Sequence, residues 1–201
     1  MRLLSFQNNT KMSAISTIQS LASCQITKGQ IIHNQAIWLE ESTLPFGKFI
    51  KQAYRQLEWK YPKFHKMDRL CKLATITARV LLQGGLLDNY AAEDIAVVVA
   101  NKTATYQTDS KHIASIHPAD YYPSPAVFVY TLPNILVGEL CIQYNIKGES
   151  AFFIQEQTNL PFLFDYSQLL LESGAAKVCL TGWVDYTDAD YNAELHLLKL
   201  A

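Results

Sequence analysis

SPAVFVYTLPNILVGELCIQYNIKGESAFFIQEQ, at residues 124–157, is the stretch of this 201-residue chain that most directly decides its fold. Ser124 followed by Pro125 is typical of a helix start, because a serine side chain caps the first turn and proline is tolerated there. The apolar stretch 134–144 predicts a second helix, which has to end before Gly148.

The residues that follow continue the alternation of strands and helices. A short strand is predicted over 151–154. An amphipathic helix is then predicted over 160–173, closed by Gly174, and a strand over 177–184. Both lie in residues 158–185, TNLPFLFDYSQLLLESGAAKVCLTGWVD.

The flanking segments repeat the same two patterns. MDRLCKLATITARVLL at 67–82 has the apolar spacing of a core helix, and IAVVVA at 95–100 is typical of a strand covered on both faces. Residues 194–200 alternate in part and predict an edge strand. No linker or repeat divides the chain, so we expect one α/β domain over 12–201, preceded by an N-terminal extension over 1–11.

Composition excludes several classes of function. The chain has 17 basic and 18 acidic residues, and a net charge of −1 argues against nucleic-acid binding. Its longest apolar runs fall far short of the ~20 residues of a membrane span, and MRLLSFQNNTK at the start lacks the features of a secretory signal. Widely spaced cysteines predict buried, reduced thiols and a cytoplasmic protein: Cys24, Cys71, Cys141 and Cys179.

Residues with metal-binding or catalytic potential do not form a recognisable set. The run Asp188-Ala189-Asp190 begins like a calcium loop, but the required glycine is Ala193 and the required glutamate is Lys199, which favours a polar turn. The sequence has no hydrolase nucleophile turn and no glycine-rich phosphate loop. The histidines show no metal-ligand spacing: His33, His65, His112, His117 and His196. We therefore predict no metal, no cofactor and no catalytic residue.

The stretch 124–185 resembles the first half of a β-ketoacyl synthase. In that family a Ser-Pro segment leads to an asparagine, a Gly-Pro-Ser-like turn ends a helix, and the nucleophilic cysteine follows a short strand. The matching landmarks are Ser124-Pro125, Asn134, Gly148-Glu149-Ser150, the strand 151–154, Gln157, the turn 174–178 and the strand 179–185. The resemblance covers residues 61–185, and residues 1–60 only loosely.

Gln157 stands where this family has its cysteine, and a carboxamide is not a nucleophile of comparable strength. The family's catalytic histidines and lysine belong to its second half, whereas this chain ends soon after Asp185. Chain length factors, the inactive partners of ketosynthases, commonly have glutamine at this position. The alternative interpretation is that Gln157 is only a polar residue left after loss of the cysteine.

The resemblance implies a single thiolase-like half, with a mixed five-stranded sheet packed by helices. A lone half would leave an apolar helical surface uncovered, with helix 134–144 as its main component. The implied function is a non-catalytic, chain-length-factor-like subunit that partners a full-length ketosynthase, or itself as a dimer, in fatty-acid-like or polyketide biosynthesis. Short ketosynthase-like proteins of aryl-polyene and flexirubin pathways are the most similar in kind.

Two other classes of function stay open at this point. The chain could be an enzyme, a decarboxylase or acyltransferase, that acts on acyl carrier protein thioesters. It could also be a self-associating module that binds acyl chains or the carrier protein.

The resemblance also assigns two sets of site residues. In this family the strand before the cysteine pairs antiparallel with its counterpart in the other protomer, which predicts an interface strand of Ser150, Ala151, Phe152, Phe153, Ile154 and Gln155. The stretch after the Ser-Pro pair reaches the partner's acyl tunnel, which predicts a chain-length gate of Ala126, Val127 and Phe128. The alternative for these three is that they are ordinary core residues of a helix.

Overall fold

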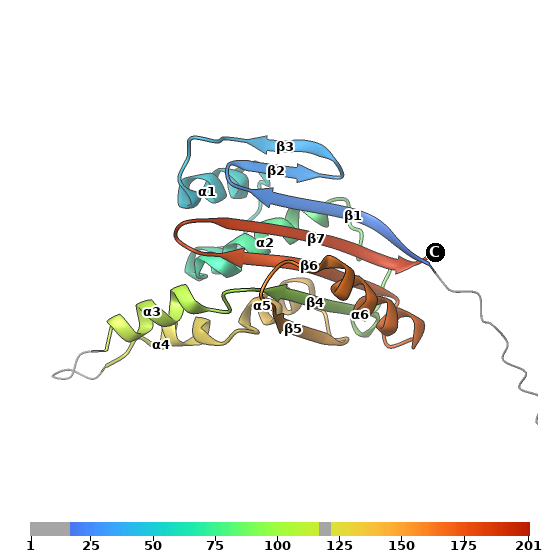
Figure 1. The fold of residues 1–201 in the computed structure, drawn as a ribbon. Helices are drawn as coiled ribbons and strands as arrows, with labels where there is room; N and C mark the ends of the chain where they lie inside the picture. The colour runs from blue at the N-terminus through green and yellow to red at the C-terminus, as the bar shows by residue number, and fades with distance from the viewer. Residues whose placement is uncertain (1–16, 117–121) are drawn as a thin grey trace, which may run out of the picture.

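Seven strands form one mixed sheet, in the order β3-β2-β1-β7-β6-β4-β5, in the computed structural model, which describes residues 17–116 and 122–201 (Figure 1). The strands are β1 (Ile18–Thr27), β2 (Gln30–His33), β3 (Ala36–Glu40), β4 (Ile95–Asn101), β5 (Ser150–Ile154), β6 (Val178–Tyr186) and β7 (Tyr191–Leu200). The helices are α1 (Phe46–Gln56), η1 (Pro62–Lys66), α2 (Arg69–Leu81), η2 (Ala92–Asp94), α3 (Tyr106–Ala114), α4 (Pro125–Phe128), η3 (Val129–Thr131), α5 (Ile135–Tyr144) and α6 (Leu160–Glu172).

The elements predicted from periodicity are confirmed in type and position. Helices α2, α5 and α6 and strands β4, β5 and β6 lie where the sequence places them. All seven residues of β4 are buried, as its continuous apolar run indicates. Strand β4 pairs in parallel with β5 and β6, and the connections through α5 and α6 make this possible.

The sheet has seven strands, which corrects the expected five. The two additional strands, β2 and β3, form an antiparallel extension of β1 within the segment that the family resemblance covers only loosely. Gly29 makes the turn between β1 and β2 with a φ of +80°, and a Cβ there would lie 2.5 Å from the backbone of Ser42. Only glycine satisfies both conditions.

Strand β7 lies inside the sheet, which corrects the prediction of an edge strand at the C-terminal end. It pairs antiparallel with β6 on one side and with β1 on the other, where Ile18 lies opposite Leu200. Its alternating pattern is nevertheless real, because its even-numbered residues up to His196 face the more polar side of the sheet. The edge strands are β3 and β5.

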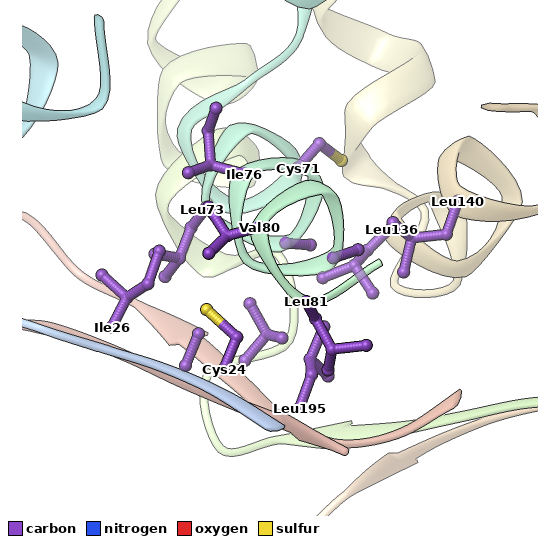
Figure 2. Packing of buried hydrophobic residues seen from close by; sticks show 14 of the residues in the cluster. Cys24, Ile26, Cys71, Leu73, Ile76, Val80, Leu81, Leu136, Leu140 and Leu195 are labelled. Atoms are coloured by element: carbon purple, nitrogen blue, oxygen red, sulfur yellow. The ribbon is translucent and has the colours of Figure 1, made fainter. Parts of the chain in front are cut away.

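The larger core lies between the sheet and helices α1, α2 and α5 (Figure 1). Helix α2 is buried along almost its whole length, and its Leu73 and Ile76 are completely inaccessible to solvent. Figure 2 shows Leu73 on the side of α2 that faces the sheet, near Ile26, and Ile76 on the side turned away from the sheet. Leu136 of α5 packs beside α2. Buried leucine and isoleucine side chains contribute about 1.5–3 kcal/mol each, so this layer supplies most of the hydrophobic stabilisation.

The opposite face of the sheet carries a smaller core under one helix, α6. Leu163 and Leu171 of α6 are buried against the sheet, next to Cys179 and Trp183 of β6. The outer side of α6 is open, and Leu169 there is 61% exposed. The two faces of the sheet are therefore covered unequally.

Within the described ranges, no helix by itself is long and apolar enough to cross a membrane. The boundary predicted between an extension over 1–11 and a domain over 12–201 lies outside the residues that the structure describes.

Candidate functional site

Strand β5 leaves one side of its backbone open at the edge of the sheet. Its only neighbour is β4, and the hydrogen bonds at its two ends run from Val97 N to Glu149 O and from Gln155 N to Asn101 O, each 2.9 Å long. In a parallel ladder alternate residues of a strand turn both backbone groups to the same neighbour. The N–H groups of Ser150, Phe152 and Ile154 therefore point away from the sheet.

The side chains of β5 alternate as expected for a strand with two packed faces. Phe152 contacts the core on the α2 side, and Ala151 and Phe153 contact the core under α6. Ile154, at the end of the strand, is 60% exposed. The role of these residues in an interface stays a prediction.

A groove of about 730 Å³ runs between α5 and β5 along this edge. One wall is formed by α5 and the residues at its two ends, and the other by β5 itself. The lining residues from the helix side include Asn134, Val137, Gly138 and Cys141. Gly138 has open space where a Cβ would stand, so the helix presents a shallow surface at this point.

Exposed large hydrophobic side chains are concentrated in one part of the chain. Of the ten in the described residues, eight belong to the region from α3 to β5. They are Tyr106, Ile113, Tyr122, Phe128, Val129, Leu132, Ile142 and Ile154. In Figure 1 helices α3 and α4 form an arm that extends beyond the sheet on the same side as β5. Such a concentration is typical of a surface that binds another protein.

Helix α5 contributes less to this surface than the sequence predicted. Leu136 and Leu140 are fully buried against α2, and Ile142 is its one large hydrophobic residue with high exposure, at 65%. The expectation that 134–144 forms the main uncovered apolar surface is therefore wrong. A second layer inside the same chain already covers most of this helix.

The three predicted gate residues lie on the arm. Helix α4 buries none of its residues: Ala126 is exposed, Val127 half-buried, and Phe128 is 55% exposed with its ring 5.4 Å from that of His112. The alternative that they are core residues of a helix does not hold. Ala126 and Val127 line a hollow of about 260 Å³ at the base of the arm.

A buried carboxylate fastens the arm to the body of the protein. Glu139 of α5 is only 2% exposed, and it accepts a hydrogen bond from the hydroxyl of Tyr130 at 3.1 Å and pairs with Lys63 at 2.7 Å. Burial and the neighbouring Glu139 raise the pKa of Tyr130 well above its ordinary value, so the tyrosine stays a hydrogen-bond donor. The sequence analysis missed this network, although Glu139 is the one charged residue in an otherwise apolar helix.

Gln157 lies exposed in the turn between β5 and α6, before the helix begins. The cap of α6 is Asn159, whose side chain accepts a hydrogen bond from Phe162 N at 3.2 Å. The first turn of α6 thus already has a partner for one of its free amides, with Pro161 in the same turn. The equivalence of Gln157 to a nucleophile stays a prediction from the resemblance.

None of the cysteines has the environment of an activated thiol. All four are free; Cys24, Cys71 and Cys179 are buried and Cys141 is partly buried. Burial raises the pKa of each, that of Cys179 to about 12 even with a hydrogen bond to Ser167 that lowers it. A thiol with a raised pKa is a poor nucleophile at neutral pH.

The remaining polar candidates lie apart from one another. The described histidines are on β2, η1, α3 and β7, and His117 lies outside the described residues. The carboxylate of Asp188 pairs with Arg69 at 2.6 Å, in the polar turn that the sequence favoured over a calcium loop. Across 17–116 and 122–201 no three His, Cys, Asp or Glu side chains come together as metal ligands.

Comparisons with known proteins identify the fold. No family model and no curated protein matches the sequence. Solved structures do match. One is the ishigamide ketosynthase/chain length factor, which matches at a TM-score of 0.67 and 14% identity, over 92% of this chain and 62% of that one. A type II polyketide synthase ketosynthase in complex with its acyl carrier protein, AntDE:AntF, matches at a TM-score of 0.62 and 13% identity over 92% and 63%.

A third match is the complex of the ketosynthase ApeO with its chain length factor ApeC from Xenorhabdus doucetiae, at a TM-score of 0.60 and 14% identity, over 92% of this chain and 79% of that one. The chain spans a little over three fifths of the length of the first two. The fold is therefore that of the ketosynthase and chain-length-factor proteins, over part of their length.

Proposed function

We propose that this chain, with its ketosynthase-type fold, is a non-catalytic subunit that pairs with a catalytic β-ketoacyl synthase in polyketide or fatty-acid-like biosynthesis. The observation that carries the proposal is the open edge of β5, which ends on the exposed Ile154, in a region of the chain that holds eight of the exposed hydrophobic side chains. An edge strand flanked by apolar surface is suited to antiparallel pairing with a strand of another protomer.

The environment of Gln157 and the cysteines supports a role without catalysis. A condensing enzyme needs a nucleophile of lowered pKa beside groups that stabilise an oxyanion. Here the residue at the position of the family's cysteine is Gln157, which is exposed, and every thiol has a raised pKa. An aryl-polyene pathway is the finer assignment that the family resemblance favours.

The arm would then shape the partner's acyl tunnel. Helix α4 projects apolar side chains into solvent from a base held by Glu139, so a docked partner would meet Phe128 and Val129 first. The gate assigned to Ala126, Val127 and Phe128 belongs to this proposal.

The test is co-expression with a full-length ketosynthase, followed by size-exclusion chromatography with light scattering. We expect a heterodimer that contains one 22.7 kDa chain, and condensation activity only in the complex. A chain that stays monomeric beside the ketosynthases of its own genome would overturn the proposal. Turnover of malonyl thioesters by the isolated chain would instead favour an enzyme that acts on carrier-protein thioesters, and a stable homodimer a self-associating module.

A further inference from the structure

A hollow of about 330 Å³ lies where the ends of α2 and α5 meet the turn that follows α2. It is lined by Arg79 in the last turn of α2, by Tyr144, the final residue of α5, and by residues 82–88. It shares no lining residue with the groove along β5. Its volume is at the small end of the range for ligand pockets, so only a compact molecule fits.

Two opposite charges line this hollow without neutralising each other. Arg79 and Asp88 are the two charged residues of its lining, and neither takes part in an ion pair within 17–116 and 122–201. The two side chains are thus too far apart to pair with one another. Unpaired charges of opposite sign in one hollow match a compact ligand that carries both charges itself.

The arginine side of the hollow has buried polar atoms without partners. Nε of Arg79 and the hydroxyl oxygen of Tyr144 have no partner in hydrogen-bond geometry among the described residues. Burial raises the pKa of Tyr144 and the neighbouring charge of Arg79 acts against it, so the phenol stays a donor at neutral pH. Cζ of Arg79 lies 5.5 Å from the centre of the Trp59 ring, a contact that positions the guanidinium and leaves its charge unneutralised. Two neighbouring donors of this kind suit a carboxylate.

The acidic side of the hollow belongs to the turn after α2. Gly85 has a φ of +75°, and a Cβ there would collide with the carboxylate of Asp88. The left-handed backbone favours glycine, and the missing Cβ leaves room for the carboxylate. The backbone N–H of Asp88 donates to Gly85 O at 3.0 Å and closes the turn. The side chain of Asp88 is exposed, so its charge is accessible to a positive group.

The rest of the lining is largely apolar and includes Leu82, Leu86 and Leu87. A small hydrocarbon group can lie against these side chains. A simple anion is a poorer match, because it would meet the carboxylate of Asp88 and the negative, C-terminal ends of α2 and α5. A positive group on the same ligand turns both of these features into favourable interactions.

We propose that this hollow binds a free α-amino acid with an apolar side chain. The carboxylate of the ligand accepts hydrogen bonds from Arg79 and Tyr144, and its ammonium group pairs with Asp88. Its side chain lies against Leu86 and Leu87. The site is separate from the β5 edge, so the ligand and a protein partner can bind at the same time.

The probe is leucine, titrated into the isotopically labelled full chain and followed by the backbone amide NMR signals of residues 84–88. Isocaproate is leucine without its ammonium group, and isoamylamine is leucine without its carboxylate. We expect leucine to bind with a Kd of about 1 mM or lower. Each truncated compound should bind about tenfold more weakly, because it leaves one charge of the hollow unpaired.

Two variants assign the two charged groups of the ligand. Arg79→Gln should weaken leucine and isocaproate about tenfold and spare isoamylamine, whereas Asp88→Asn should weaken leucine and isoamylamine and spare isocaproate. Arg55→Gln and Asp165→Asn remove the same charges from exposed positions elsewhere and should leave leucine binding unchanged. Thermal melts show whether Arg79→Gln, which also loses its contact with Trp59, stays folded. Asp88→Asn and the two truncated compounds test the proposal without that variant.

Three results would overturn the proposal: no saturable shift of the signals of residues 84–88 with leucine, equal binding of leucine and either truncated compound, or equal losses of leucine and isocaproate binding in Asp88→Asn. None of these outcomes depends on whether a ketosynthase binds at β5.

Discussion

Helix α5 has two kinds of apolar surface, one packed inside the fold and one exposed. Leu136 and Ile142 are six residues apart in the same helix, yet the first is fully buried and the second is 65% exposed. The difference is not composition but the presence of α2, which supplies a second layer on one side only. Apolar surface on the α2 side stabilises the fold, and the side chain of Ile142 stays accessible to a partner.

The largest effect expected from this contrast is on folding. Ile76→Ala, in the covered layer, should lower the free energy of unfolding by about 2–5 kcal/mol, because it leaves a cavity that the neighbours do not fill. Leu169→Ala, on the open side of α6, should change it by about 0.5 kcal/mol or less. Urea denaturation measures both, and similar losses would mean that the two layers are equally packed.

The next effect concerns the anchor of the arm. Glu139→Gln should cost about 1–3 kcal/mol, because Lys63 loses its counter-charge and the hydrogen bond from Tyr130 is weakened. Tyr130→Phe leaves Oε1 of Glu139 without its donor but keeps the ion pair between Lys63 and Oε2, so a smaller loss is expected. Hydrogen exchange of α4 should rise in both variants, and unchanged protection there would show that the arm is held by other contacts.

Tyr130 also makes the stability of the folded protein depend on pH. Its pKa is raised in the folded protein, so the unfolded chain loses the proton first. The stability from this group is complete below the unfolded value of about 10 and is lost as the pH rises above it toward the folded pKa. Thermal melts between pH 8 and 11, roughly spanning that range, should show a steeper decline for the wild type than for Tyr130→Phe, and parallel curves would contradict the assignment.

The β5 edge is tested by proline at two positions whose N–H groups point in opposite directions. The N–H of Ile154 points away from the sheet, so Ile154→Pro should leave folding nearly intact and weaken assembly about tenfold, with Ile154→Ala as control for the lost side chain. The N–H of Ala151 points toward β4, so Ala151→Pro should instead lower stability by about 1–3 kcal/mol. Light scattering over a dilution series with the partner gives the first result, and urea denaturation the second. If Ile154→Pro and Ile154→Ala assemble like the wild type, the interface lies elsewhere.

The spacing of apolar residues in the sequence predicted the elements that are almost completely buried. The apolar run of β4 and the helical spacing of α2 identified both elements because each is buried on nearly all sides. The position of β7 was not predictable, because it depends on pairing between Ile18 and Leu200 at opposite ends of the chain. The exposure of α4 was not predictable either, because an apolar sequence does not show whether a second layer covers it. Glu139 could be recognised in the sequence as a lone charge in an apolar helix, but its ion-pair partner, Lys63, comes from a distant segment.

A smaller effect is expected at the gate. Val127 is half-buried beside a hollow of about 260 Å³, where a larger side chain would exclude methylenes worth about 0.8 kcal/mol each. In the complex with a ketosynthase, Val127→Trp should shorten the product and Val127→Gly should leave it equal or longer. Mass spectrometry measures the product length for both variants. An unchanged distribution of product lengths from intact complexes would show that this segment is not part of the gate.

The smallest effect is expected at Gln157, the position that the family resemblance singles out most sharply. Gln157→Cys should produce no condensation activity in the isolated chain, because a thiol in this exposed turn lacks the neighbours that make a cysteine nucleophilic. The first turn of α6 is closed by its own cap at Asn159, so it offers the new thiolate little stabilisation. The reaction of the thiol with iodoacetamide between pH 6 and 9 should follow a pKa near the ordinary value of about 8.5. Carbon–carbon bond formation by the purified variant above the wild-type background would contradict both this expectation and the proposal of a non-catalytic subunit.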